Sequence, residues 1–254
     1  MNSKKLLLLT LLCCPILQTF AHDHLNLEHG VPLEVEDAYT TAYMNREFHT
    51  YFIYEDLPDD EDRYLLVPRL ELGLFRNFQA EVATPFEFGD VENETSGNIE
   101  LASLYNFNME TIWVPGTSLG GGVTLPTGEG REGYDTFLKL NLTKTLPVPI
   151  SFHRLHANIY WTQNAQPEKS ERINAMKYVI AHQVRVGTDD FFIVDYFYEE
   201  HLEDKNKTQM VELGWRHQYN PLTVLAAGIG SGLTDESPDF RINLSFQRAL
   251  NLFY

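Results

Sequence analysis

The sequence predicts an all-β protein: a single antiparallel transmembrane β-barrel of about twelve strands, with the N and C termini both periplasmic. Three observations predict it. Residues 239–254 alternate polar and apolar side chains almost without a break. Strand-like segments of similar length then account for most of the chain from residue 46 onward. The connections between them alternate between short turns and longer polar loops, which is typical of bacterial outer-membrane barrels.

The first residues have the pattern of a secretory signal peptide. Lys4 and Lys5 precede an apolar run that ends near Leu17, and small residues up to Ala21 offer a cleavage site. The apolar run is too short for a transmembrane helix. We therefore expect residues 1–21 to be removed on export. Both cysteines of the chain lie in this segment, so the mature protein would have no disulfide.

Residues 22–45 form a polar leader with little periodicity. Cleavage after Ala21 would leave a free amine with a histidine at the third position. Together, His22, His24 and the nearby His29 offer nitrogen ligands of the kind that Cu²⁺ and Ni²⁺ prefer. The alternative interpretation is a solvated tail that binds no metal.

Most of the expected strands are nine or more residues long, which is enough to cross the hydrocarbon core of a bilayer. Because successive side chains of a strand point to opposite faces, alternation indicates one apolar and one polar face. It is clearest in the third, sixth, tenth and last segments. The expected strands are residues 47–55, 64–75, 78–88, 98–108, 112–125, 136–144, 150–162, 176–186, 191–201, 209–219, 222–232 and 239–254.

The connections are sorted by length. Short turns are expected at residues 76–77, 109–111, 145–148, 187–190 and 220–221. Longer polar loops are expected at residues 56–63, 89–97, 127–135, 164–174, 202–208 and 233–238. A β-sandwich has no reason to sort its loops this way. Since closure also leaves no free sheet edge, we expect residues 46–254 to form one barrel domain with both termini at the short-turn end.

The chain is strongly acidic, with 36 acidic and 19 basic residues and a net charge of −17. This argues against nucleic acid as a partner. The expected location is the bacterial outer membrane. The expected partners are outer-membrane lipid and lipopolysaccharide, small-molecule solutes, and the barrel-assembly machinery, which would bind the C-terminal strand.

If the apolar faces meet lipid, the opposite faces line the lumen. Their charges of both signs would set the selectivity of a pore or form an ion-pair network that closes it. We expect a narrow or loop-gated lumen, because about twelve strands are fewer than in open porins. The charged lumen-lining candidates are Arg69, Glu71, Glu81, Glu87, Glu100, Lys139, Lys177, Arg185, Asp195, Glu212, Arg216 and Arg241.

Two other clusters have weaker patterns. The acidic residues from Glu55 to Asp62 could bind Ca²⁺, but without a spaced glycine they fit a solvated loop better. Ser151 and His153 are two positions apart and would share a strand face, as a serine hydrolase requires. No acidic residue of that strand would orient the histidine. We predict no catalytic residue, no cofactor and no enzymatic activity.

Six segments, in this order, resemble one known family. They are VEDAY (35–39), LELGLFRNFQA (70–80), GVTLPTGEG (122–130), VELGWR (211–216), VLAAGIGSGL (224–233) and SPDFRINLSF (237–246). Together they resemble the outer-membrane proteins named for the meta-cleavage pathway of phenol degradation. The resemblance covers roughly residues 35–254 and implies a transporter-like barrel that admits small organic molecules, aromatic compounds among them. It assigns no functional residues.

Two other functions stay open. One is a metal-handling barrel that binds Cu²⁺ or Ni²⁺ through the histidines of the leader. The other is an outer-membrane hydrolase that uses Ser151 and His153.

Overall fold

The structure is a computed structural model that describes residues 26–58, 61–90, 96–128, 133–148, 151–167, 169, 171–202 and 206–250. Within these residues no helix is long or apolar enough to cross a membrane. The expected signal peptide, residues 1–21, and the expected metal ligands His22 and His24 lie outside the described residues. The strands are β1 (Arg46–Leu57), β2 (Glu61–Phe75), β3 (Phe78–Ala83), β4 (Phe86–Gly89), β5 (Ile99–Asn108), β6 (Gly116–Leu125), β7 (Asp135–Leu146), β8 (His153–Asn164), β9 (Asn174–Arg185), β10 (Asp190–Glu200), β11 (Lys207–Asn220), β12 (Thr223–Gly232) and β13 (Phe240–Ala249).

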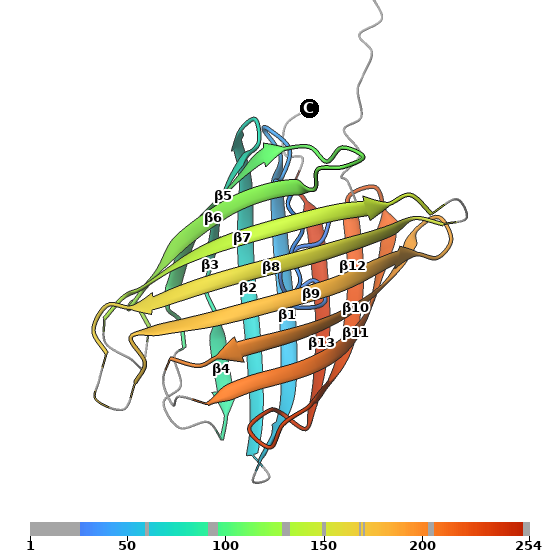
Figure 1. Cartoon of the computed structure of the whole chain (residues 1–254). Helices are drawn as coiled ribbons and strands as arrows, with labels where there is room; N and C mark the ends of the chain where they lie inside the picture. Colours follow the sequence, from blue (N-terminus) through green and yellow to red (C-terminus); the bar gives the residue numbers. More distant parts are fainter. Residues whose placement is uncertain are drawn as a thin grey trace, which may run out of the picture.

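The strands form one closed antiparallel sheet (Figure 1). From β5 to β13 each strand pairs with the next in the chain, β3 joins β5 to β2, and β1 closes the ring by pairing with β2 on one side and β13 on the other. β3 and β4 both pair with β2 and form one interrupted strand. Pro85 lies between them and has no N–H to donate to the ladder. The predicted all-β barrel of twelve strands is therefore confirmed.

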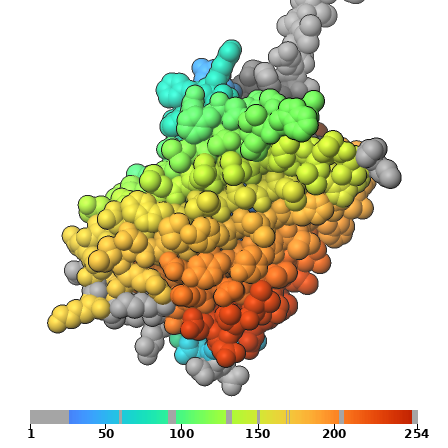
Figure 2. All heavy atoms as spheres, viewed as in Figure 1, coloured from blue at the N-terminus to red at the C-terminus, as the bar shows by residue number. Residues whose placement is uncertain are grey.

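The two faces of the sheet differ sharply in polarity. On β13, Arg241 and Gln247 point inward and are buried, whereas Leu244 on the outward face is 54% exposed. On β7, Lys139 is buried and Leu138 is 51% exposed. A soluble protein has the opposite distribution, so this outer surface fits lipid rather than water. On the face seen in Figure 2, side chains of neighbouring strands form a continuous wall.

The strand ends match the expected segments to within about three residues, with three differences. The last strand, β13, ends at Ala249 rather than at residue 254, and residues 251–254 lie outside the described residues. The β1–β2 hairpin is longer than expected, because Asp56 pairs with Asp62 and Leu57 with Glu61. Much of the acidic run is therefore strand, and the expected long loop at residues 56–63 is wrong. β6 begins at Gly116 rather than at residue 112. Residues 109–115 instead form a turn.

Both ends of the barrel chain lie at the same rim. Ala249 pairs with Glu47, and the Leu250 N–H donates to the Arg46 carbonyl at 2.7 Å. The connections at this rim are residues 76–77, 109–115, 147–152, 186–189 and 221–222. We name it the short-turn rim, and the opposite end the long-loop rim. The expectation that the short-turn rim faces the periplasm stays a prediction.

Candidate functional site

The leader runs inside the barrel, where its blue trace passes within the ring of strands (Figure 1). Leu27, Val31, Leu33 and Ala38 are all at most 2% exposed. The interpretation of the leader as a solvated tail is therefore wrong for this part. Its apolar side chains are surrounded by the inner faces of the strands, and its backbone polar groups find partners there.

The inner part of the leader is a compact hairpin. The Leu27 N–H donates to the Asp37 carboxylate at 3.2 Å, and the Asp37 N–H donates to the Leu27 carbonyl at 2.9 Å. Gly30 turns the chain with a φ of 78°, in the left-handed region that favours glycine. The turn of the hairpin therefore lies inside the lumen, where Gly30 is packed against the Tyr51 ring of β1.

Two glutamates of the leader bind it to three strands of the wall, β7, β9 and β13. The Lys139 ammonium lies 2.9 and 2.8 Å from the two carboxylate oxygens of Glu36. Glu34 accepts hydrogen bonds from Lys177 at 2.6 Å and from Arg241 at 2.7 Å. Because all of these groups are largely withdrawn from water, each ion pair resists loss of either partner.

Backbone contacts hold the same segment in place. The Glu36 N–H donates to the Asn158 side-chain oxygen at 2.9 Å, and the Asn158 amide returns a bond to the Glu36 carbonyl at 2.7 Å. Nearer the short-turn rim, the Thr41 N–H donates to the side-chain oxygen of Gln79 at 2.7 Å. The polar side chains of the inner face thus form the binding site of the leader.

Two glycines of the wall make room for the leader. A Cβ added at Gly214 would lie 2.9 Å from Leu33 Cγ, and one added at Gly228 would lie 2.7 Å from Leu33 Cδ2. Both distances are well below normal van der Waals contact. Because these two glycines of β11 and β12 have no side chain, they leave the space that the Leu33 side chain occupies, which we call the Leu33 seat.

A cavity of about 180 Å³ remains between the leader and the long-loop rim. Its walls come from β2, β3, β5, β7, β8, β9 and β10. Five glutamates, three basic residues and His29 line it, together with aromatic side chains. We call it the vestibule, and the lining residues that matter below are Glu81, Glu100, Phe137, Lys139, Tyr160 and Lys177.

The structure places most of the predicted lumen residues on the inner face. Buried there are Arg69, Glu71, Glu81, Glu87, Lys139, Asp195, Glu212, Arg216 and Arg241. Glu100 and Lys177 line the vestibule. Arg185 differs, because it lies at the short-turn rim and donates to the carbonyls of Gly187 and Thr188 at 3.1 and 2.6 Å.

Sequence reasoning missed the leader glutamates as parts of the lumen. The signal was present: Leu33, Glu34, Val35 and Glu36 alternate apolar and acidic residues, as an extended segment between two different environments does. Together with the basic residues expected on the inner faces of the strands, this alternation could have indicated that the leader lies inside the barrel.

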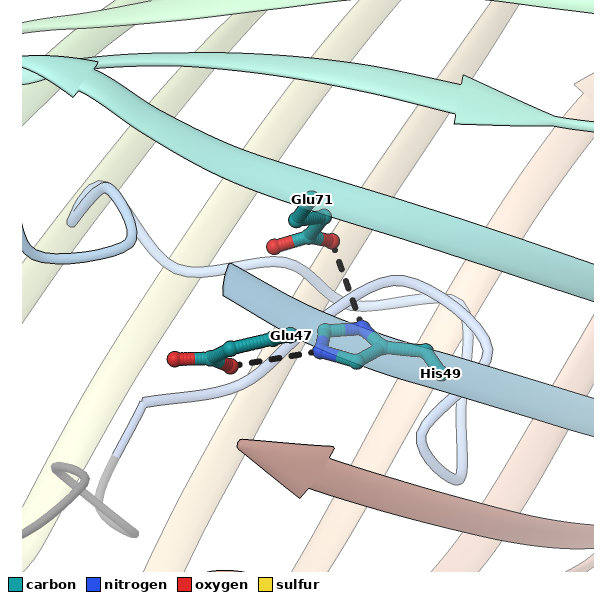
Figure 3. Close-up of side chains that lie close together, drawn as sticks. All are labelled: Glu47, His49 and Glu71. Carbon is teal, nitrogen blue, oxygen red and sulfur yellow. Dashed lines mark hydrogen bonds and ion pairs between the residues drawn. The ribbon is translucent and has the colours of Figure 1, made fainter. Parts of the chain in front are cut away.

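A cluster of possible metal ligands lies near the short-turn rim. Glu47, His49 and Glu71 are buried and each offers one ligand atom within 4.8 Å of the others. Figure 3 shows His49 between the two glutamates, with Nε2 3.3 Å from Glu47 and Nδ1 3.3 Å from Glu71. One ion could use only one of these nitrogens. The arrangement therefore fits an imidazole ion-paired on both sides better than a chelate.

The predicted metal ligand His29 has protein partners. Its Nε2 lies 2.9 Å from the Glu34 carboxylate, and the Arg69 guanidinium donates to its backbone carbonyl at 3.1 Å. Binding of Cu²⁺ or Ni²⁺ by the leader stays a prediction, since His22 and His24 lie outside the described residues.

Ser151 and His153 lie together, as a shared strand face requires. Ser151 Oγ is 2.5 Å from His153 Nε2, and His153 Nδ1 is 3.0 Å from His182 Nε2. These three hydrogen-bonded side chains lie on the outer surface, because the neighbouring outward residues Leu155 and Ile180 are 43% and 59% exposed. It is thus separated from the lumen by the barrel wall.

Comparisons with known proteins agree on the fold. No protein-family model matches the chain, and no curated protein matches it in sequence. Among solved structures, the COG4313 outer membrane channel from Pseudomonas putida F1 superposes with a TM-score of 0.68 at 12% identity, covering 84% of this chain and 98% of that one. The NanC porin gives 0.55 at 8% identity, and the KdgM porin 0.52 at 10%; each covers 80% of this chain and 98% of its own. The chain therefore has the fold of outer-membrane channels and porins.

Proposed function

We propose that the protein is an outer-membrane channel that admits small organic molecules, aromatic compounds among them. The observation that carries the proposal is a charged, partly hollow interior enclosed by an apolar outer wall. Only a lipid environment makes that distribution favourable, and a polar interior is what solutes crossing a membrane need. The channels and porins that share the fold support the same function.

The proposed orientation follows from the two rims. The long-loop rim faces the exterior and meets lipopolysaccharide, and the short-turn rim faces the periplasm, as in other bacterial barrels. Solute enters the vestibule first. The leader separates the vestibule from the short-turn rim, so passage requires the leader to shift. The expected link to phenol degradation fits the aromatic lining from Phe137 and Tyr160.

Permeation assays test the proposal. The mature chain, and a variant lacking residues 27–41, would be reconstituted into liposomes for swelling assays and into planar bilayers for recordings. We expect small, brief conductance steps from the intact chain and larger, sustained steps from the variant. Absence of conductance and of solute entry for both proteins would refute the channel.

A second candidate function rests on Ser151 and His153. A hydroxyl 2.5 Å from an imidazole, which is itself held by His182, has the order of a nucleophile, a base and an orienting group. Its place on the outer surface would give it access to acyl esters of membrane lipids. Hydrolysis of a chromogenic fatty ester, abolished by Ser151→Ala, would support this function. Equal rates for both proteins would remove it.

A further inference from the structure

Every basic residue of the vestibule already has a carboxylate partner. Lys139 binds Glu36, as described above. Lys177 lies 2.6 Å from Glu34 and 3.0 Å from Glu199. An anionic ligand would therefore have to displace a carboxylate that the protein supplies itself.

Arg69, the third basic residue of the vestibule, also has partners within the protein. The Arg69 guanidinium lies 3.5 Å from the Glu81 carboxylate, and it donates to the backbone carbonyl of His29 at 3.1 Å. Its Cζ lies 5.6 Å from the centre of the Tyr51 ring, which is within cation–π distance. Of the three bases that line the vestibule, none is left to bind a ligand of negative charge.

Two carboxylates of the vestibule, Glu100 and Glu200, have no basic partner among the described residues. Glu200 accepts hydrogen bonds from the Tyr198 hydroxyl at 3.0 Å and the Met176 N–H at 3.1 Å, whereas Glu100 has neither kind of partner. Glu100, at the start of β5, lines the cavity. Among the described residues it takes part in no hydrogen bond and in no ion pair within 4.0 Å. With five carboxylates against three bases, the lining has an excess of negative charge. A partly buried carboxylate is costly to leave unpaired, so this position favours a cation from outside.

The rest of the lining suits the organic part of such a cation. Phe137 and Tyr160 present aromatic surface to it. Ammonium groups bind to aromatic faces as well as to carboxylates. The volume of about 180 Å³ is smaller than the range of about 300–1,000 Å³ that is usual for drug-sized ligands. The ligand should therefore be compact.

We propose that the vestibule is a binding site for small organic cations, with the ammonium group on Glu100 and the apolar body against Phe137 and Tyr160. This inference deepens the proposed function, on which it rests, by naming the substrate class. A neutral molecule of the same shape would leave Glu100 unpaired. An anion of the same shape would meet the excess negative charge.

Binding to the purified mature chain in detergent tests the inference without any transport. Three probes of similar size differ in charge: 2-phenylethylamine, 2-phenylethanol and phenylacetate. Calorimetric titration at pH 7 should show saturable binding of the amine alone. Glu100→Gln removes one charge-assisted contact and should weaken the amine about ten- to a hundredfold.

Glu61→Gln is the matched control. It removes the same charge at the long-loop rim but does not line the vestibule, so amine affinity should stay within about twofold of the parent, since exposed charges are largely screened. A thermal melt of each variant shows that it is folded. If Glu100→Gln does not fold, Phe137→Leu provides the test, because it keeps the charge and should still weaken the amine severalfold.

The outcomes separate this inference from the proposed function. Equal binding of all three probes, no binding of the amine, or full affinity in Glu100→Gln would overturn the inference. If neutral solutes still cross liposomes in that case, the channel stands without the cation site. Amine binding that depends on Glu100, without any solute passage, would support the site and refute the channel.

Discussion

Removing one charge from the Glu36–Lys139 pair should release the leader. The side chains of these two residues are only 3% and 5% exposed. In Lys139→Met, Glu36 keeps its charge in a buried position but loses its principal cation. Breaking a buried pair on one side costs about 3–5 kcal/mol. At about 1.4 kcal/mol per factor of ten, the displaced state should become roughly a hundredfold to a few thousandfold more populated.

Two measurements report that change. Hydrogen exchange should speed up at the Glu36 amide, which donates to Asn158 at 2.9 Å in the docked leader. Single-channel recordings should show a higher open probability. The double variant Glu36→Gln with Lys139→Met should recover much of the docking, because it leaves no unpaired buried charge.

Lys144→Met is the matched control on the same strand. The Lys144 side chain is 28% exposed and pairs with Glu110 at 3.4 Å, away from the leader glutamates. Exposed pairs of this kind contribute little to stability. If Lys139→Met and Lys144→Met leave leader exchange and conductance equally unchanged, the ion pair does not hold the leader.

Three further predictions have defined outcomes, two for substitutions and one for the native chain. Gly228→Ala places a methyl group against Leu33 and should undock the leader, seen as faster proteolysis of the leader, whereas normal protection would contradict the seat. Burial alone would raise the pKa of Glu110, but hydrogen bonds from Thr145 lower it below the ordinary carboxyl value. The stabilisation from the ionised carboxylate should therefore be complete above the ordinary carboxyl pKa and should be lost as the pH falls through the lowered pKa. Thermal melts of Glu110→Gln should lack this loss of stability in acid. Trp113, 89% exposed on the turn at the short-turn rim, should lie in the membrane interface, so a fluorescence maximum typical of free water would contradict this placement.

Much of the barrel could be predicted because each strand carries its own two-residue alternation. Leu138, Lys139, Leu140 and Asn141 are enough to assign the two faces of β7. The register that buries Lys139 leaves Leu138 outside, and a slip of one residue would reverse both. Local patterns therefore determine which side chains reach the lumen.

The path of the leader could not be predicted in the same way. Its contacts join residues far apart in the chain, such as Glu34 with Arg241 and Gly30 with Asn243. No local pattern specifies such pairs. The vestibule could not be predicted for the same reason, since Glu100, Lys139 and Lys177 line one cavity only after the sheet has closed.

The internal position of the leader has a consequence for biogenesis. The seam between β1 and β13 joins the two ends of the barrel chain, so it can form only after the last strand has been delivered. The Gly30 carbonyl accepts a hydrogen bond from Asn243, which belongs to the final strand, so this contact is also completed only when β13 is in place. A barrel halted before its last strand would therefore lack both the closing seam and one of the anchors of its own leader.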